Sequence, residues 1–401
     1  MHERWDHRAD LAQQAITDRH ASKVWSIPRT NLAVIGWPAM SRDKVFFRWH
    51  YWWQAQYLDC QIDAIERRPS QRRLQDLQRT LRGMRVRNLA RLTHNDFYDD
   101  KAWLALAMGR AEKLTKLKRV KGRQALEEDI VAGVDPLTGV LPWRKNETFF
   151  NVPTNGPAAI MAARTGRLEL AQQLLDWIWE HMINPDGLVM DGLWMKMNGP
   201  VPEPTIHTYC QGVVLGATVE LAVALRAQAG VKGDEVSDVG MEYVYRAAGL
   251  IDAIARHLTD SHYVINAGTL GGDGGLFNGI LVRYLALAVE KLPQVGPRTR
   301  RARGIARKIV LRSAESAWRY RLEIDGLPVF PARWDQDATL PQSGGLVGAT
   351  IAGAVGSSDI AERDLSVQLS GWMLMEAAAK VAADDRDGDG VGVNHWGALR
   401  L

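Results

Sequence analysis

Hydrophobic positions recur with the period of an α-helix along almost the whole chain. Alternating, strand-like patterns are short and lie only in connections, as at residues 188–190 and 263–265. The helical period predicts helices over residues 7–23, 42–66, 71–87, 97–115, 123–132, 156–166, 168–183, 207–229, 238–258, 276–292, 297–320 and 360–382. The pattern therefore predicts an all-α protein.

Long connections rich in Gly, Pro and Asp separate several of these helices, at residues 139–155, 184–205, 266–275 and 325–357. Long ordered loops usually carry function. No linker divides the chain, so we expect one domain over residues 1–401. A solenoid would show a repeat of fixed period, and none is visible. The favoured fold is an (α/α)6 barrel, with six helical hairpins in a double ring and the long loops around a site at one end.

Composition narrows the class further. The chain is 46% hydrophobic, without the roughly 18 consecutive apolar residues of a membrane-spanning segment. No hydrophobic segment follows the first charged residues, which predicts a cytoplasmic protein unless it is exported by another route.

The two cysteines, Cys60 and Cys210, indicate neither a disulfide framework nor a zinc site. Basic runs at 113–123 and 298–308 lie near predicted helix ends, where cations are common, so no nucleic-acid partner is expected. Oligomeric state is not indicated.

Two adjacent carboxylates, Asp99 and Asp100, stand between aromatic residues at the predicted start of the helix over 97–115. Like charges held this close push one pKa up and leave the other low. Glycoside hydrolysis uses such a split, because one carboxylate attacks the sugar and the other protonates the leaving oxygen. Neighbouring aromatic rings offer apolar faces to sugar rings. The pair is therefore a candidate catalytic site.

A structural explanation of the same pair stays open at this point. Thr93, Asn95 or Asp96 is suited to cap the helix, and the helix dipole favours acids in the first turn without any catalytic role. A magnesium-binding DDxxD motif, as in all-α prenyl-diphosphate enzymes, is excluded, because its fifth position is occupied by Trp103.

Five segments together resemble glycoside hydrolase family 76, the endo-α-1,6-mannanases. Segment 98–103, Tyr-Asp-Asp-Lys-Ala-Trp, is similar to the Y-D-D-x-A-W signature of that family. Four more follow the family order: W-W-x-A at 52–55, S-N-x-P…A-R at 154–164, T-Y-N-Q-G at 208–212 and F-K-G-I…R-Y at 277–284. The resemblance covers roughly residues 45–375, and the combination is more specific than any one motif.

The resemblance implies an (α/α)6 barrel and an endo-acting enzyme that cleaves α-1,6-mannosidic linkages of mannan or lipomannan-type glycans with retention of configuration. It implies that Asp99 is the nucleophile and Asp100 the general acid/base, with no cofactor and no metal. Two positions depart from the family. Cys210 stands where Asn is usual and Asn278 where Lys is usual, so we expect a different subsite preference.

Further side chains are candidates for binding an α-1,6-linked mannan. Rings suited to stack on sugars or to flank the acidic pair are Trp52, Trp53, Tyr98, Trp103, Trp194 and Trp334. Groups suited to hydrogen-bond sugar hydroxyls are Asn155, His207, Tyr209, Gln211 and, in a Gly-rich loop, Asp273. For each of them, packing in the core or in a structural loop is the alternative explanation.

Two other functions stay open. An (α/α)6 sugar epimerase or unsaturated-uronyl hydrolase would keep the fold, but it would need a catalytic His pair or a lone acid. A non-catalytic glycan-binding protein would use the aromatic residues without the acids. If the protein is cytoplasmic, we expect it to turn over an endogenous α-1,6-mannan such as a lipomannan core.

Overall fold

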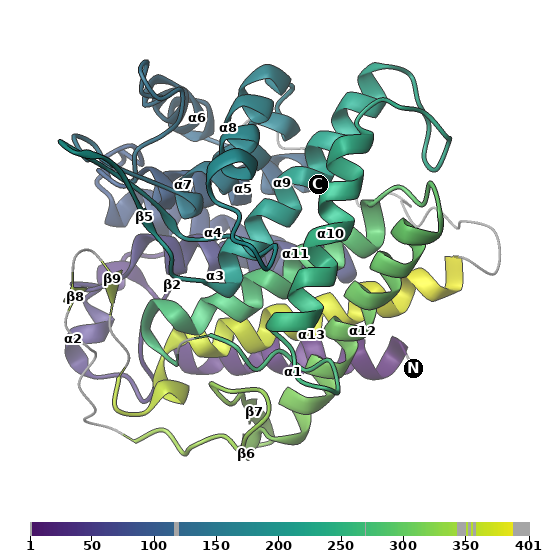
Figure 1. Cartoon of the computed structure of the whole chain (residues 1–401). Coiled ribbons are helices and arrows are strands. Elements are labelled where there is room, and N and C mark those ends of the chain that lie inside the picture. The colour runs from purple at the N-terminus through teal and green to yellow at the C-terminus, as the bar shows by residue number, and fades with distance from the viewer. Residues whose placement is uncertain are drawn as a thin grey trace.

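The helices predicted from the hydrophobic period are present, several with shifted ends (Figure 1). The computed structural model describes residues 2–115, 120–268, 270–342, 350–351, 354–355 and 358–387. Residues 116–119 of the first basic run and parts of the predicted connection 325–357 therefore lie outside the described residues.

Six helices form an inner ring in which each helix contacts the next and the last contacts the first (Figure 1). They are α3 (Tyr51–Arg67), α5 (Tyr98–Thr115), α7 (Val152–Arg164), α9 (Thr208–Gln228), α11 (Phe277–Lys291) and α13 (Leu365–Asp387). Small residues let these helices approach closely. A Cβ at Gly212 of α9 would lie 2.9 Å from the Cα of Leu281 in α11. A Cβ at Gly279 would lie 2.7 Å from the Cα of Ser370 in α13.

Each inner helix carries an outer helix. The outer helices are α4 (Gln71–Arg87), α6 (Arg123–Ala132), α8 (Leu168–His181), α10 (Met241–His257), α12 (Pro297–Arg319) and α1 (His2–His20). They pack in that order on α3, α5, α7, α9, α11 and α13, so the N-terminal helix completes the last hairpin. The predicted (α/α)6 barrel is confirmed. A single domain over the whole chain stays a prediction.

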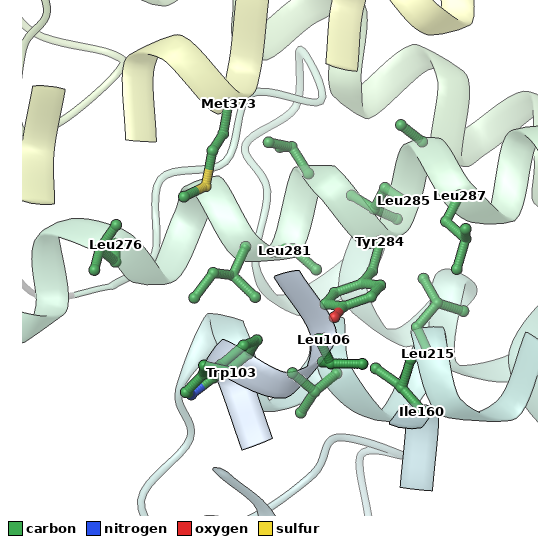
Figure 2. Packing of buried hydrophobic residues seen from close by; sticks show 14 of the residues in the cluster. Trp103, Leu106, Ile160, Leu215, Leu276, Leu281, Tyr284, Leu285, Leu287 and Met373 are labelled. Carbon is green, nitrogen blue, oxygen red and sulfur yellow. The ribbon is translucent and has the colours of Figure 1, made fainter. Parts of the chain in front are cut away.

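The interior of the ring is apolar at the level of the central turns. Figure 2 shows Trp103 of α5, Ile160 of α7, Leu215 of α9 and the α11 side chains Leu281 and Tyr284 in one cluster. Four different inner helices thus contribute to the same packed core, whose burial of apolar surface stabilises the ring. Helix α9 is long and apolar enough to cross a membrane, but most of it is buried in this core.

A cluster of charged side chains joins α3, α5 and α11 inside the ring. The guanidinium of Arg110 bonds to Asp59 and Asp63, each at 2.6 Å. Arg283 bonds to the other oxygens of the same two carboxylates, at 3.0 and 2.8 Å. Paired in this way, these partly buried charges link three inner helices. Cys60 lies buried in the same cluster as a free thiol, as Cys210 does in α9.

Short strands and 3-10 turns occupy the connections. One antiparallel sheet has the order β3-β4-β5, with Phe149 opposite Trp194. The strands are β1 (Ala21–Ser22), β2 (Leu32–Ala33), β3 (Phe149–Asn151), β4 (Gly192–Lys196), β5 (Gly199–Glu203), β6 (Leu322–Ile324), β7 (Leu327–Val329), β8 (Thr350–Ile351) and β9 (Ala354–Val355). The 3-10 turns are η1 (Val24–Ser26), η2 (Gly272–Leu276) and η3 (Ala361–Arg363).

Four inner helices hold a preceding connection through one buried amide side chain. In each case the amide oxygen accepts the N–H of a residue and the amide nitrogen donates to the C=O of that same residue. The pairs are Gln54 with Ala33, Asn155 with Leu141, Gln211 with Val189, and Gln368 with Phe330, at 2.8 to 3.0 Å. These amides satisfy main-chain groups of irregular segments that enter the core.

Several predicted boundaries were wrong. The helix expected over 42–66 is two helices, α2 (Ser41–Lys44) and α3, because Phe46 and His50 adopt positive φ angles of 54° and 46°. The last helix begins at Leu365, and the first spans His2–His20. The strand patterns at 188–190 and 263–265 form only isolated bridges. The hairpin β4–β5 was missed because Pro200 and Pro202 interrupt its alternation.

Candidate active site

Asp99 and Asp100 lie in the first turn of α5. The N–H of Tyr98, the first helical residue, donates to the backbone oxygen of Trp143 at 2.9 Å. Just before the helix, the side-chain oxygen of Asn95 accepts the N–H of Phe97 at 3.0 Å. Inner and outer helices alternate along the chain and pack as hairpins, so the inner helices all begin at the same end of the barrel. The acidic pair therefore lies among helix N-termini, which favour negative charge.

The two carboxylates have unequal partners. Asp99 accepts two N–H groups, from the indole of Trp143 at 3.0 Å on Oδ2 and from the backbone of Asp100 at 2.8 Å on Oδ1. Asp100 accepts the side-chain amide of Asn95 at 2.7 Å. Hydrogen bonds to a carboxylate favour its ionised form, so Asp99 is the better stabilised anion.

Both carboxyl groups hold their protons more tightly than an exposed aspartate. Burial raises the pKa of Asp99 to about 7, against the opposing effect of its two N–H donors. Burial and then the charge of Asp99 raise the pKa of Asp100 well above its usual range. The pair thus shares a proton near neutral pH, and Asp100 holds it more firmly.

A third carboxylate, Asp273, lies beside the pair. It belongs to η2, just before α11, and its Oδ1 accepts both indole N–H groups of Trp52 and Trp53, at 2.9 and 2.7 Å. Its negative charge contributes to the raised pKa of Asp99 and of Asp100. The structure therefore brings together the predicted residues Trp52, Trp53 and Asp273 next to the acidic pair.

Aromatic rings from four inner helices, α3, α5, α9 and α11, surround these acids. Tyr209 stacks on Phe277 with ring centroids 3.9 Å apart, and His207 meets the edge of the same Phe277 ring at 5.1 Å. The ring of Trp52 lies 6.5 Å from that of Tyr209 and 6.4 Å from that of Trp103. Trp52 and Tyr209 are only partly buried, so parts of these rings are accessible beside the carboxylates.

A further group of aromatic rings forms a row that was not predicted from the sequence. Trp143 meets Phe97 and Phe149 edge-on at 5.1 and 6.1 Å, and Phe149 stacks on Trp194 at 4.4 Å. The row runs from the acidic pair to the β3-β4-β5 sheet. Only Trp194 was a candidate from the sequence. The sequence offered one indication for Trp143: it is a tryptophan in a long predicted connection, outside any predicted helix.

Asp191 is a further acidic residue that the sequence reasoning missed. It immediately precedes β4, and its Oδ1 accepts the thiol of Cys210 at 3.7 Å. Burial raises the pKa of Asp191 to about 7, and the charge of Glu203 adds to that. Burial raises the pKa of Tyr209 well above its usual range, and the charges of Cys210, Asp191 and Asp99 raise it further, so Asp191 lies near the same group of residues. The departure at Cys210 thus lies at the edge of the site.

The other departure, Asn278, holds structural elements together. Its Oδ1 accepts the hydroxyl of Thr208 at the start of α9 at 2.7 Å, and its Nδ2 donates to the C=O of Ala267 at 3.1 Å. A lysine at this position could not accept from Thr208.

Some residues predicted to bind sugar are instead buried on backbone groups or packed in the core. The amides of Asn155 and Gln211 are fully buried on backbone groups, as described above. Tyr98 packs towards the outer helix α6, and Gly133 at the end of α6 leaves room for the Tyr98 ring. The Nζ of Lys101, also in α5, lies 3.8 Å from the centre of that ring. Trp103 and Trp334 are 5% and 2% exposed and belong to the core. For these residues the structure shows packing or backbone contacts.

Among the described residues, no group of three His, Cys, Asp or Glu side chains is arranged to hold a metal ion. The chemistry available at this end of the barrel is that of carboxylates, indole and phenol rings. Two coupled carboxylates with unequal partners, bordered by accessible aromatic rings on an (α/α)6 barrel, define a glycoside hydrolase.

The chain belongs to glycosyl hydrolase family 76, whose family model matches residues 12–350. The family resemblance predicted from the sequence is confirmed. No curated protein sequence matches the chain significantly.

Solved structures similar to this chain include the α-1,6-mannanase GH76A of Salegentibacter sp. HEL1_6, at 27% identity and a TM-score of 0.74, covering 94% of this chain and 99% of that one. An inactive variant of that mannanase, with two adjacent aspartates changed to asparagine, was solved in complex with α-1,6-mannotriose and matches at 26% identity, a TM-score of 0.73 and the same coverage. The Lin0763 protein of Listeria innocua matches at 25% identity and a TM-score of 0.74, covering 95% and 98%.

Proposed function

We propose that this protein is an endo-acting α-1,6-mannanase that cleaves its substrate with retention of configuration. The observation that carries the proposal is the Asp99–Asp100 pair, with its unequal hydrogen bonds, in a chain of glycosyl hydrolase family 76. Support comes from the similar Salegentibacter enzyme, whose inactive aspartate variants were solved with α-1,6-mannotriose and α-1,6-mannotetrose.

Asp99 is the proposed nucleophile. Its two N–H donors stabilise the ionised carboxylate that must attack the anomeric carbon. Asp100 is the proposed general acid/base, because it has the more strongly raised pKa and holds a proton that it can donate.

In the first step a carboxylate oxygen of Asp99 forms a bond to the anomeric carbon. The glycosidic C–O bond breaks, and the proton of Asp100 passes to the leaving oxygen. In the second step Asp100 takes a proton from water, whose oxygen attacks the same carbon and releases Asp99 as a carboxylate. Two inversions at one carbon give net retention.

Trp52 and Tyr209 are the proposed platforms for mannose rings. Both rings are partly accessible beside the carboxylates, and both are held in place, Trp52 by Asp273 and Tyr209 by Phe277. His207 and Asp273 are the proposed hydroxyl-binding groups, because they lie against these two platforms. A lipomannan-type substrate and a cytoplasmic location stay predictions.

The deciding experiment is digestion of linear α-1,6-mannan, with the products sized over time. We expect a ladder of oligosaccharides early in the reaction, together with α-anomers in proton NMR spectra of the first products. Release of mannose alone would contradict endo action, and β-anomers would contradict retention. Cleavage of α-1,2- or α-1,3-linked mannan at the same rate would contradict specificity for the α-1,6 linkage.

A further inference from the structure

Four apolar side chains lie exposed at one place on the surface. Phe47 and Leu89 are 80% and 76% exposed, and Val45 and Trp25 are 52% and 45% exposed. We call these four residues the apolar patch. They come from three separate segments: η1, the loop between α2 and α3, and the turn that follows α4.

Hydrogen bonds hold these segments together. The indole N–H of Trp25 donates to the C=O of Val45 at 2.8 Å. Arg87, near the end of α4, donates to the C=O of Phe46 at 2.8 Å and to that of Phe47 at 3.4 Å. Its guanidinium also lies over the ring of Trp25, at 5.7 Å from the centroid. The patch is therefore an ordered surface.

The backbone is unusual at two of the four patch residues. Trp25 and Leu89 have positive φ angles of 47° and 52°, an uncommon conformation for large side chains. At the end of α4, the N–H of Ala90 returns to the C=O of Arg85 at 2.7 Å, and Leu89 stands at the tip of that turn. Such strain at an exposed apolar residue is a candidate sign of function.

The segments that carry the patch are strongly basic, and we call their exposed cations the basic rim. Exposed cations on the same segments are Lys23, Arg29, Arg42, Lys44, Arg48, Arg82 and Arg91. Residues 23–50 and 80–94 contain a single acid, Asp43, which is buried and accepts the N–H of Met40 at 2.9 Å. None of the seven cations forms an ion pair within the described part of the chain, although many other arginines of this protein do.

The patch lies at the catalytic end of the barrel. Helix α4 packs on α3 as a hairpin, so the end of α4 lies beside the start of α3. The Tyr51 hydroxyl at the start of α3 donates to the C=O of Leu92 at 2.9 Å, and Trp49 meets the Tyr51 ring edge-on at 5.4 Å. Trp52, which follows Tyr51 in α3, donates its indole N–H to Asp273 in the active site.

We propose that the apolar patch and its basic rim dock this protein onto an anionic lipid bilayer. Phe47 and Leu89 enter the boundary between headgroups and acyl chains, and the rim cations face lipid phosphates. Aromatic and aliphatic side chains bordered by Lys and Arg are the chemistry that such a surface attracts. An uncharged mannan would offer no partner to seven cations. Docking in this orientation would place the active site close to the bilayer, and it does not depend on the proposed function.

Co-sedimentation of the full chain with lipid vesicles tests the proposal. With vesicles of phosphatidylglycerol and phosphatidylcholine in equal parts, we expect binding at low salt that weakens as salt rises, because added ions screen the charges. With vesicles of phosphatidylcholine alone, we expect binding at least about tenfold weaker, because the basic rim finds no anionic surface. Absence of binding to the anionic vesicles, or equal binding to both kinds, would overturn the proposal.

Matched variants test whether the apolar patch and its basic rim are the surface that binds the vesicles. Phe47→Ser/Leu89→Ser should weaken binding at least about tenfold, given the free energy of burying two such side chains. Leu137→Ser/Val236→Ser, which changes side chains 93% and 84% exposed elsewhere, should bind as wild type. Lys44→Glu/Arg48→Glu should weaken binding by a similar factor. Arg300→Glu/Arg301→Glu, on α12, is the control for the same change of net charge.

A glycan-binding surface is the alternative occupant. Gel retardation by soluble α-1,6-mannan without lipid separates the two. Wild type and Phe47→Ser/Leu89→Ser should be retarded equally, because the docking proposal leaves glycan binding untouched. Loss of retardation in that variant, or unchanged vesicle binding by both patch variants, would overturn the proposal.

Discussion

The indole N–H of Trp143 donates to Asp99 Oδ2 at 3.0 Å, while the backbone oxygen of the same tryptophan accepts the first helical N–H of α5 at 2.9 Å. One loop residue thus sets both the start of the helix and the environment of the proposed nucleophile. The position of the carboxylate and its pKa are therefore coupled to the packing of the 139–155 connection.

Trp143→Phe keeps the aromatic row and removes the N–H donor. The ionised form of Asp99 then loses a hydrogen bond, so its pKa should rise above about 7. Because the nucleophile must be ionised, the acidic limb of the pH profile of kcat/KM should move to higher pH, by about one unit. Trp194→Phe, which changes a ring stacked on Phe149, is the control and should leave that limb in place.

The roles of the two aspartates are separable with an activated aryl α-mannoside, whose leaving group needs no proton. Asp100→Asn should lower mannan cleavage about 10²–10⁴-fold. It should lower formation of the mannosyl-enzyme from the activated substrate far less. Asp99→Asn should lose about 10⁴-fold on both substrates. Equal losses for Asp100→Asn on the two substrates would show that Asp100 is not the acid.

Asp273→Asn removes a negative charge and keeps an oxygen that can accept the indole N–H groups of Trp52 and Trp53. Asp273 raises the pKa of Asp99 and of Asp100, so its neutralisation should lower both. Activity rises with pH as Asp99 ionises and falls as Asp100 loses its proton. Both limbs of the pH profile should therefore shift to lower pH. A change in KM without any shift would assign Asp273 to sugar binding alone.

Asp191→Asn tests whether the acid at the edge of the site binds substrate. A charged hydrogen bond to a sugar hydroxyl contributes about 1.5–3 kcal/mol, so we expect KM for mannan to rise about tenfold or more with little change in kcat. Glu203→Gln, which alters a neighbouring charge, is the control, and we expect it to leave KM nearly unchanged. An unchanged KM in Asp191→Asn would place Asp191 outside the binding surface.

Gln211→Leu separates a structural from a sugar-binding role. Leucine leaves the N–H and C=O of Val189 and the C=O of His207 without their partner in the core. We expect a loss of about 2–4 kcal/mol in the free energy of unfolding, measured by urea denaturation. Gln78→Leu, at an exposed position of α4, should lose little. A raised KM with unchanged stability would instead support sugar binding by Gln211.

Local sequence determined the helices well. Apolar spacing located all twelve helices of the two rings, because each has a face or a whole circumference to bury. It merged α2 with α3, since the positive φ angles of Phe46 and His50 leave no mark in a hydrophobic pattern. The family motifs located the acidic pair correctly at the start of α5, but the same motifs contain residues that serve the fold. Asn155 and Gln211 hold connections by their amides, and a motif does not distinguish that from binding sugar.

What the sequence by itself determined is the helical period, the adjacency of Asp99 and Asp100, and through its motifs the family. Only the tertiary structure decided the partners of that pair. Trp143 lies 44 positions from Asp99, and Asp273 reaches Trp52 across 221 positions. The reason is physical: a pKa depends on burial and on charges a few ångströms away, and those neighbours are set by the closure of the ring.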